Sequence, residues 1–174
     1  DAVIVATPDH NHAVVTMKAI KMGKHVYCQK PLTHTVYEAR EITKAAKKYN
    51  VQTQMGNQGG SNPLLNMVQN WIDTDAVGAI SEVKIWTNRP VWPQGGDRPE
   101  GSDPVPDTLD WDAWIGPAPM RPFKSGVYHS FNWRGWLDFG AGALGDMACH
   151  IMDAAFWNLE LVCIFNSATD FIDI

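Results

Sequence analysis

The sequence has few cysteines, few charged residues and no long apolar run. Its three cysteines, Cys28, Cys149 and Cys163, are odd in number and lack metal-site spacing, so we expect free thiols, as in a reducing compartment. Charged residues make up 19% of 174 residues, the net charge is −5, and no cluster of Lys and Arg indicates a nucleic-acid partner. No apolar run approaches the roughly 20 residues that span a bilayer, so we expect no membrane partner.

Apolar residues are abundant enough to form a core, at 45% of the chain. The chain opens directly in the run DAVIVATP, without Met or a leader, and we expect it to be an internal fragment. The compartment is left open: cytoplasmic, or periplasmic if an export signal precedes the fragment.

Strand-like and helix-like segments alternate through the first third of the chain. Apolar, β-branched runs predict strands near residues 2–7, 25–29 and 51–55, with helices within 12–24 and over 36–49. This alternation predicts a parallel sheet whose ligands bind beyond the carboxyl ends of the strands. Those ends read ATPDHNH, CQKPL and MGNQGG, and all three are polar or rich in Gly and Pro.

The rest of the chain has a different texture. We expect a helix over 63–77, a strand in GAISEVKIWTNRP where Ile80, Val83 and Ile85 alternate, and a helix over about 144–157. Between Arg89 and Arg134 the chain is dense in Pro, Gly and Trp. A long irregular segment of this composition typically carries function.

The phrase GAGALG matches a dinucleotide-binding pattern but has the wrong context. Gly140, Gly142 and Gly145 fit G-x-G-x-x-G, and Glu160 follows about 20 residues on, but the preceding FNWRGWLDF does not read as a buried strand. We expect these glycines instead to permit a close approach at a helix N-terminus.

A polar stripe follows in GDMACHIMD. Asp146, His150 and Asp153 fall on one helical face at i, i+4 and i+7. The stripe is either a solvated helix face or a general acid/base site, in which a carboxylate orients the imidazole and raises its pKa. We predict no metal site, because no third ligand is obvious.

Three further motifs suit a ligand as well as a plain structural role. Lys30, beside Pro31, lies between a strand and a helix, although most lysines are simply exposed. Two histidines follow the first strand in ATPDHNH, where one could cap a helix. The arginine of NWRGW suits a phosphate or a ring, or else a structural cation–π cluster.

Together these motifs resemble one family. VIVATPDHNH, HVYCQKPL, MGNQ, NWRGW and GDMACHIMD occur in the order and approximate spacing of the glucose–fructose oxidoreductase / inositol dehydrogenase (Gfo/Idh/MocA) family, up to about Glu160. The resemblance implies an α/β fold: the C-terminal part of a parallel Rossmann-like sheet in residues 1–58, then part of an α/β substrate domain with an open sheet in 59–174. It implies NAD or NADP as cofactor, a sugar or cyclic polyol as substrate, and a homo-oligomer formed through the open sheet.

The resemblance also assigns roles to single residues. Lys30 matches the Lys of the family's E-K-P motif, beside the nicotinamide and the reacting hydroxyl, whereas Gln29 replaces the Glu and lacks its charge. His150 matches the proton-transfer residue of the family's Asp-x-x-x-His. The expected catalytic residues are Lys30, His150 and Asp146; the cofactor-binding residues are Thr7, Pro8, His12, Gln29, Lys30, Pro31, Asn57, Trp133 and Arg134; the substrate-binding residues are Lys30, Tyr128, His129, Asp146 and His150.

The resemblance leaves the reaction open. Phrases such as NRPVWPQG and VPDTLDWDAWIGPAP resemble a branch that includes NAD-dependent glycosidases, which oxidise the sugar, eliminate the aglycone and reduce the ring again. Tyr128 or His129 would assist that elimination. The family's glycine fingerprint is absent and the pattern is lost from about Leu161, so the fragment is expected to bind NAD poorly. A non-catalytic sugar-binding module is the third interpretation.

Overall fold

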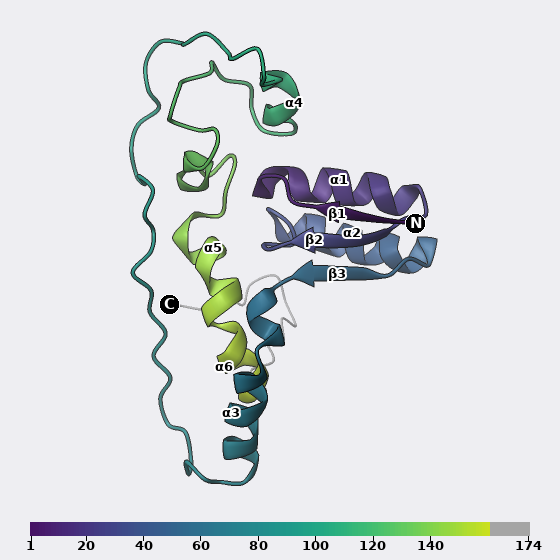
Figure 1. The fold of residues 1–174 in the computed structure, drawn as a ribbon, viewed down its shortest axis with the longest axis vertical. Helices are drawn as coiled ribbons and strands as arrows, with labels where there is room; N and C mark the ends of the chain where they lie inside the picture. Colours follow the sequence, from purple (N-terminus) through teal and green to yellow (C-terminus); the bar gives the residue numbers. More distant parts are fainter. Residues whose placement is uncertain (161–174) are drawn as a thin grey trace. The chain divides into compact units, whose positions relative to one another are not determined.

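The computed structural model describes residues 1–160, and the segment after Leu161 and the thiol of Cys163 lie outside them (Figure 1). The chain divides into two compact units. The first comprises residues 1–57 and 87–149, and the described part of the second comprises 58–86 and 150–160. The expected domain boundary at residue 58 stays a prediction.

A three-stranded parallel sheet in the order β1-β2-β3 opens the first unit. Its strands are β1 (Ala2–Val5), β2 (His25–Gln29) and β3 (Thr53–Gly56). Val5 is in register with Cys28, and Cys28 with Met55, so the three carboxyl ends lie along one edge. The predicted β-α-β-α-β arrangement is confirmed.

Helices α1 (Asp9–Lys21) and α2 (Val36–Tyr49) connect these strands and pack on one face of the sheet (Figure 1). Val5 and Val26 point into this core, whereas Ile4, on the opposite face, is 75% exposed. α1 begins earlier than expected, at Asp9. The polar tip after β1 is therefore the first turn of a helix.

Helix α2 is delimited by its own sequence. The Thr35 hydroxyl accepts a hydrogen bond from the Glu38 N–H, and the Glu38 carboxylate accepts one from the Thr35 N–H, which forms a capping box. Asn50 ends the helix in the left-handed conformation, at φ 50°.

The Trp-rich segment of the first unit, residues 89–139, folds around an aromatic core and is called the aromatic segment below. It is mostly irregular and contains only α4 (Trp111–Ile115) and the 3₁₀ turn η2 (Asn132–Gly135). The buried guanidinium of Arg121 pairs with Asp138 and lies 4.6 Å from the centre of the Phe139 ring. The core consists of Trp111, Ile115, Phe123, Tyr128, Trp133 and Phe139.

The second unit contains η1 (Gln58–Ser61) and α3 (Pro63–Asp73), which is shorter than predicted. The predicted strand in residues 78–90 is wrong: this segment runs without a ladder, because residues 1–160 offer no strand beside it to bond its backbone. The alternation of its apolar residues has another cause. Ile80, Val83 and Ile85 line an apolar hollow together with α3 and α6 side chains.

The single helix predicted over 144–157 is also wrong. The chain forms α5 (Gly142–Ile151) and α6 (Asp153–Asn158), with a turn at Met152 between them. Asp153 is therefore not on the helix that carries Asp146 and His150. It is the first residue of α6, where the helix dipole stabilises a carboxylate.

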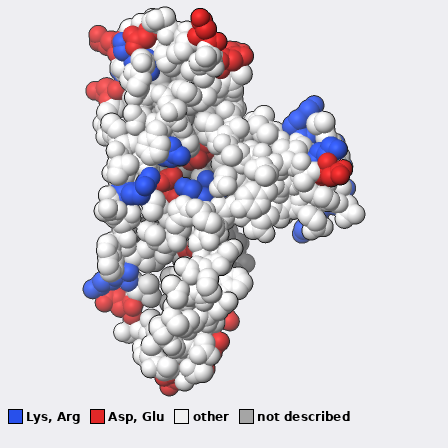
Figure 2. All heavy atoms as spheres, in the orientation of Figure 1, with Lys and Arg blue, Asp and Glu red and all other residues white. Residues whose placement is uncertain are grey.

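No helix within residues 1–160 is long and apolar enough to cross a membrane. Most of the face shown in Figure 2 is uncharged, and several Lys or Arg side chains lie beside Asp or Glu.

The capping box gives a test of the fold. Thr35→Ala should lower the free energy of unfolding by about 1 kcal/mol, because the Glu38 N–H loses its acceptor. Thr43→Ala is the matched control: Thr43 is exposed within α2, and its hydroxyl donates only to the Ala39 carbonyl. Urea unfolding of both variants measures the difference, and equal midpoints would contradict the role of the cap.

Candidate active site

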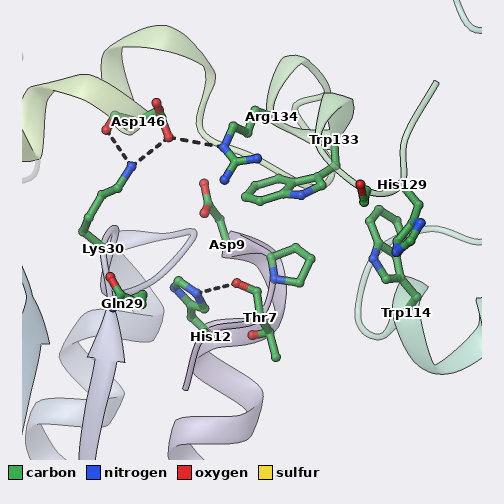
Figure 3. A pocket seen from close by; sticks show the side chains of 13 residues that line it. Thr7, Asp9, His12, Gln29, Lys30, Trp114, His129, Trp133, Arg134 and Asp146 are labelled. Carbon is green, nitrogen blue, oxygen red and sulfur yellow. Dashed lines mark hydrogen bonds and ion pairs between the residues drawn. The ribbon is translucent and has the colours of Figure 1, made fainter. Parts of the chain in front are cut away.

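A pocket of about 460 Å³ lies beyond the carboxyl ends of β1 and β2, within the first unit (Figure 3). Its wall combines the two strand ends with residues of the aromatic segment and α5. It is lined by Ala6, Thr7, Pro8, Asp9, His12, Gln29, Lys30, Trp114, His129, Ser130, Trp133, Arg134 and Asp146. This is the edge of a parallel sheet at which ligands are expected.

Lys30 and Asp146 form an ion pair in this pocket (Figure 3). The Lys30 Nζ donates to Asp146 Oδ1 at 2.7 Å and to the Asp146 backbone carbonyl at 2.9 Å. The two side chains are 17% and 7% exposed. The interpretation of Asp146 as part of a solvated helix face is therefore wrong, and Lys30 is not a free surface lysine.

Two arginines add positive charge around the same carboxylate. Arg134 Nε lies 3.6 Å from Asp146 Oδ1, and Arg89 Nη2 lies 4.0 Å from Oδ2. With Lys30, three cations thus surround one buried anion. Such an excess of fixed positive charge favours negative charge that develops on a bound oxygen.

Asp9 is a second buried carboxyl in the pocket wall. The sequence places it in the polar tip after the first strand but assigns it no catalytic or binding role. It is 4% exposed, and burial raises its pKa to about 6. The charges of His12 and Lys30 and the Ala141 N–H lower that pKa, while Asp146 raises it further. The signal for Asp9 was its position directly after a strand end; Trp114 and Ser130 had no comparable signal.

His12 connects the two strand ends. Its Nε2 lies 2.7 Å from the Thr7 carbonyl and its Nδ1 2.7 Å from the Pro31 carbonyl, and the residue is 1% exposed. Thr7 and Pro31 are both among the predicted cofactor-binding residues. Thr7 lines the pocket, whereas Pro31 is not in the lining and contributes the carbonyl that contacts His12 Nδ1.

The glycines of GAGALG act as expected. A Cβ on Gly140 would lie 2.8 Å from the Arg134 Cα, so only glycine permits this contact, and Gly142 has φ +65° where α5 begins. The segment before them is η2, not a strand. The dinucleotide-fingerprint interpretation is therefore excluded for these residues.

Arg134 forms the predicted structural cation–π cluster, and its role toward a phosphate or a ligand ring stays a prediction. Its guanidinium lies 4.3 Å from the centre of the Trp133 ring and 4.4 Å from that of Phe131, which is a cation–π cluster. It also faces Asp146 in the pocket.

Some predicted residues lie elsewhere. Tyr128 is 2% exposed in the aromatic core and does not line the pocket, whereas His129 does. Asn57 follows β3 outside the lining, with its Oδ1 buried and without a hydrogen-bond partner. His150 lies in the last turn of α5, in the second unit, and its role as the proton-transfer residue stays a prediction.

The residues present fit a nicotinamide cofactor. The Thr7 Oγ1 is buried in the pocket wall without a hydrogen-bond partner, and Gln29 brings an amide to the same wall. A carboxamide or ribose hydroxyl would satisfy such groups. Within residues 1–160, no three His, Cys, Asp or Glu side chains gather as a metal site would require.

A parallel α/β unit with a polar pocket at its strand ends is typical of nucleotide-binding enzymes. The comparisons with known proteins agree. Residues 1–57 match the NAD-binding Rossmann-fold model of the Gfo/Idh/MocA oxidoreductases and residues 63–161 match their C-terminal α/β domain model. The chain therefore belongs to the Gfo/Idh/MocA oxidoreductase family.

Curated relatives include enzymes of sugars and inositols. Levoglucosan dehydrogenase of Pseudarthrobacter phenanthrenivorans is 29% identical over 87% of this chain and 31% of its own length. The scyllo-inositol 2-dehydrogenase (NAD(+)) of Bacillus subtilis is 28% identical over 60% of this chain and 28% of its own. The chain thus spans less than a third of the length of these relatives.

Solved structures similar to the chain include an inositol dehydrogenase homologue from Azotobacter vinelandii, complexed with NADH and myo-inositol. It is 31% identical, with a TM-score of 0.43, and the match covers 44% of this chain and 20% of that one.

Asp9 gives a stability test. Its pKa of about 6 in the folded protein exceeds the ordinary value of 3.8, so the folded state binds the proton more tightly than the unfolded state. Its contribution to stability is full at low pH and is lost as the pH rises from about 4 to about 6. This difference in pKa corresponds to roughly 3 kcal/mol of stability.

Between pH 4 and pH 7, the free energy of unfolding of Asp9→Asn should therefore rise by about this much relative to that of the wild type, as measured by urea unfolding at each pH. Asp107→Asn, at an exposed position, controls for the removal of a carboxylate. Parallel stability curves for Asp9→Asn and the wild type would contradict the burial argument.

Proposed function

We propose that this chain supplies the part of the active site at which an NAD(P)-dependent oxidoreductase transfers hydride from a secondary hydroxyl-bearing carbon of a sugar or cyclic polyol. The observation that carries the proposal is the Lys30–Asp146 ion pair in a pocket at the ends of β1 and β2. Family membership and the sugar and inositol dehydrogenases among the relatives support it.

The cofactor would lie against the strand ends. Thr7, Pro8 and Gln29 are the residues that would hold its nicotinamide end, and the Arg134–Trp133 pair would offer a cationic and aromatic surface. The bound cofactor supplies the hydride acceptor. The protein's task is then to orient the substrate hydroxyl and handle its proton.

Lys30 is suited to orient that hydroxyl. An ammonium group has three N–H donors, and two of them point to the side-chain and backbone oxygens of Asp146. The third remains for a substrate oxygen. Because Asp146 fixes the other two directions, the third is aimed without further loss of entropy, and its charge stabilises an alkoxide as it forms.

The far wall of the pocket suits a sugar ring. Trp114, Trp133 and His129 present ring surfaces there, and Ser130 a hydroxyl. A sugar or polyol has C–H faces that pack on rings and hydroxyls that require polar partners. His150 would take the hydroxyl proton, as the family's Asp-x-x-x-His implies; Asp146 precedes it by one turn of α5.

The deciding assay offers the full-length protein NAD⁺ or NADP⁺ with inositols, an anhydrosugar or a nitrophenyl glycoside. Accumulation of reduced cofactor with a polyol or sugar supports the proposal. Release of nitrophenol without reduced cofactor would favour the glycosidase reaction instead. Failure to bind either cofactor in a titration would favour the non-catalytic module.

Lys30→Ala should lower turnover by about 10²–10⁴-fold, since it removes the positioned donor and leaves the Asp146 carboxylate without its closest cation. Lys30→Arg should not restore turnover, because the broad guanidinium cannot replace a compact ammonium. Asp146→Asn should combine with Lys30→Ala by less than the product of the two losses, since the residues act as a unit. Steady-state rates measure all four effects, and Lys44→Ala, 72% exposed, is the control.

His150→Ala should cut turnover by about 10²–10⁴-fold while the cofactor dissociation constant changes little, because the imidazole is proposed to move a proton rather than hold the cofactor. Rate measurements and cofactor titration of the same preparation test this. Near-wild-type turnover would leave His150 a structural residue of α5.

A further inference from the structure

His12 is held by two acceptors of the same kind, one from each strand end. The carbonyl oxygens of Thr7 and Pro31 lie 2.7 Å from its two ring nitrogens. Thr7 follows β1, and Pro31 is the residue after Lys30, which follows β2. One buried ring thus spans the two loops that form the pocket wall.

This geometry requires a charged ring. A neutral imidazole has one N–H and one lone pair, so it satisfies only one of two carbonyls. The other nitrogen would then face a carbonyl oxygen with two lone pairs opposed, and the distance of 2.7 Å leaves no room for a water between them. The imidazolium has two N–H donors and satisfies both carbonyls.

The surroundings of the ring are consistent with that charge. Burial disfavours the charged ring, but hydrogen bonding with Cys28 and the Pro31 carbonyl and the charge of Asp9 outweigh burial and raise the pKa of His12 above 6.5. The titratable groups that face the ring are Asp9 from its own helix and Cys28 from β2. Lys30 and Asp146 act on Asp9 from the other side.

We propose that His12 is a positioning residue: as an imidazolium with Asp9 as its counter-ion, it ties the ends of β1 and β2 together and thereby holds the Lys30 backbone in place. The effect on catalysis rests on the proposed function; the charge of the ring does not. When the ring loses its proton, one of the two hydrogen bonds is lost. Lys30 then keeps its side-chain partner but loses part of its backbone support.

His10 offers a matched control two residues earlier in the same helix. It is 2% exposed, and its ring nitrogens contact the Phe139 and Trp114 carbonyls at 3.2 and 3.0 Å. Unlike His12, it also has a possible donor: the Asn11 side-chain amide lies 3.2 Å from its Nε2. Burial lowers its pKa, and the two carbonyls that its ring contacts belong to Trp114 and Phe139 rather than to the Lys30 loop. Loss of His10 therefore removes a buried imidazole without removing the connection between the strand ends.

The charge is tested on the full-length wild-type protein, independently of any activity. Nitrogen NMR of ¹⁵N-histidine-labelled protein, with His12→Gln used to assign the signal, should show both His12 ring nitrogens protonated at pH 6, with a midpoint above 6.5. One unprotonated ring nitrogen at pH 6, or a midpoint below 6.5, would overturn the inference, even in an active enzyme. A charged His12 in a protein that oxidises no polyol would overturn the proposed function and leave the charge assignment intact.

The positioning role is tested with His12→Gln, which retains one amide donor but does not titrate, and with His10→Gln. The ratio of wild-type to His12→Gln turnover should fall at least severalfold as the pH rises through the midpoint measured by NMR, because only the wild type loses a hydrogen bond there. The ratio for His10→Gln should stay constant across that range. A constant ratio for His12→Gln would show that the ring is a structural filler and overturn the positioning role. If His12→Gln does not fold, the position of the Lys30 and Pro31 backbone in wild-type crystals on either side of the midpoint decides, and an unchanged backbone there overturns the positioning role.

Discussion

The ion pair of Lys30 and Asp146 is the interaction on which the pocket depends, because it joins the end of β2 to a helix that begins more than a hundred residues later. Both partners are largely buried. In that setting the loss of one partner leaves a charge without compensation, which costs far more than the net gain from forming the pair. The pair therefore specifies geometry: α5 must approach the strand end closely enough for a 2.7 Å contact.

Two other features serve that approach. Gly140 allows the chain to pass against the Arg134 backbone, and Gly142 takes a positive φ as α5 begins. On the sheet side, His12 holds the loop that follows β2 through the Pro31 carbonyl. A lysine held by fixed neighbours on both sides would need little reorganisation if negative charge developed on a bound oxygen, and such preorganisation is the main source of electrostatic catalysis.

The aromatic segment gives this arrangement its rigid wall. Stacking of Trp111 on Trp114, at 4.9 Å between ring centres, and burial of Phe139 order a stretch that has almost no regular backbone structure. The Trp residues of this segment therefore serve first to form its core. Trp114 and Trp133, at the edge of that core, are already ordered by it, so their rings line the pocket without a further loss of conformational entropy.

The sequence by itself determined the local structure, because local structure depends on neighbouring residues. The parallel strands, α2 with its capping box, and the role of Gly140 and Gly142 followed from periodicity and from backbone constraints that act over a few positions. The loop of Lys30 and the NWRGW phrase, which the sequence singled out, contribute Lys30, Trp133 and Arg134 to the pocket. Partners distant in the sequence were decided only by the tertiary structure. Asp146 is a buried ion-pair partner and not a solvated residue because Lys30 meets it, and Asp9 has a raised pKa because α1 begins early and buries it. Residues 78–90 have the alternation of a strand but form none, since a ladder requires a neighbouring strand as well as a pattern and residues 1–160 place none beside them.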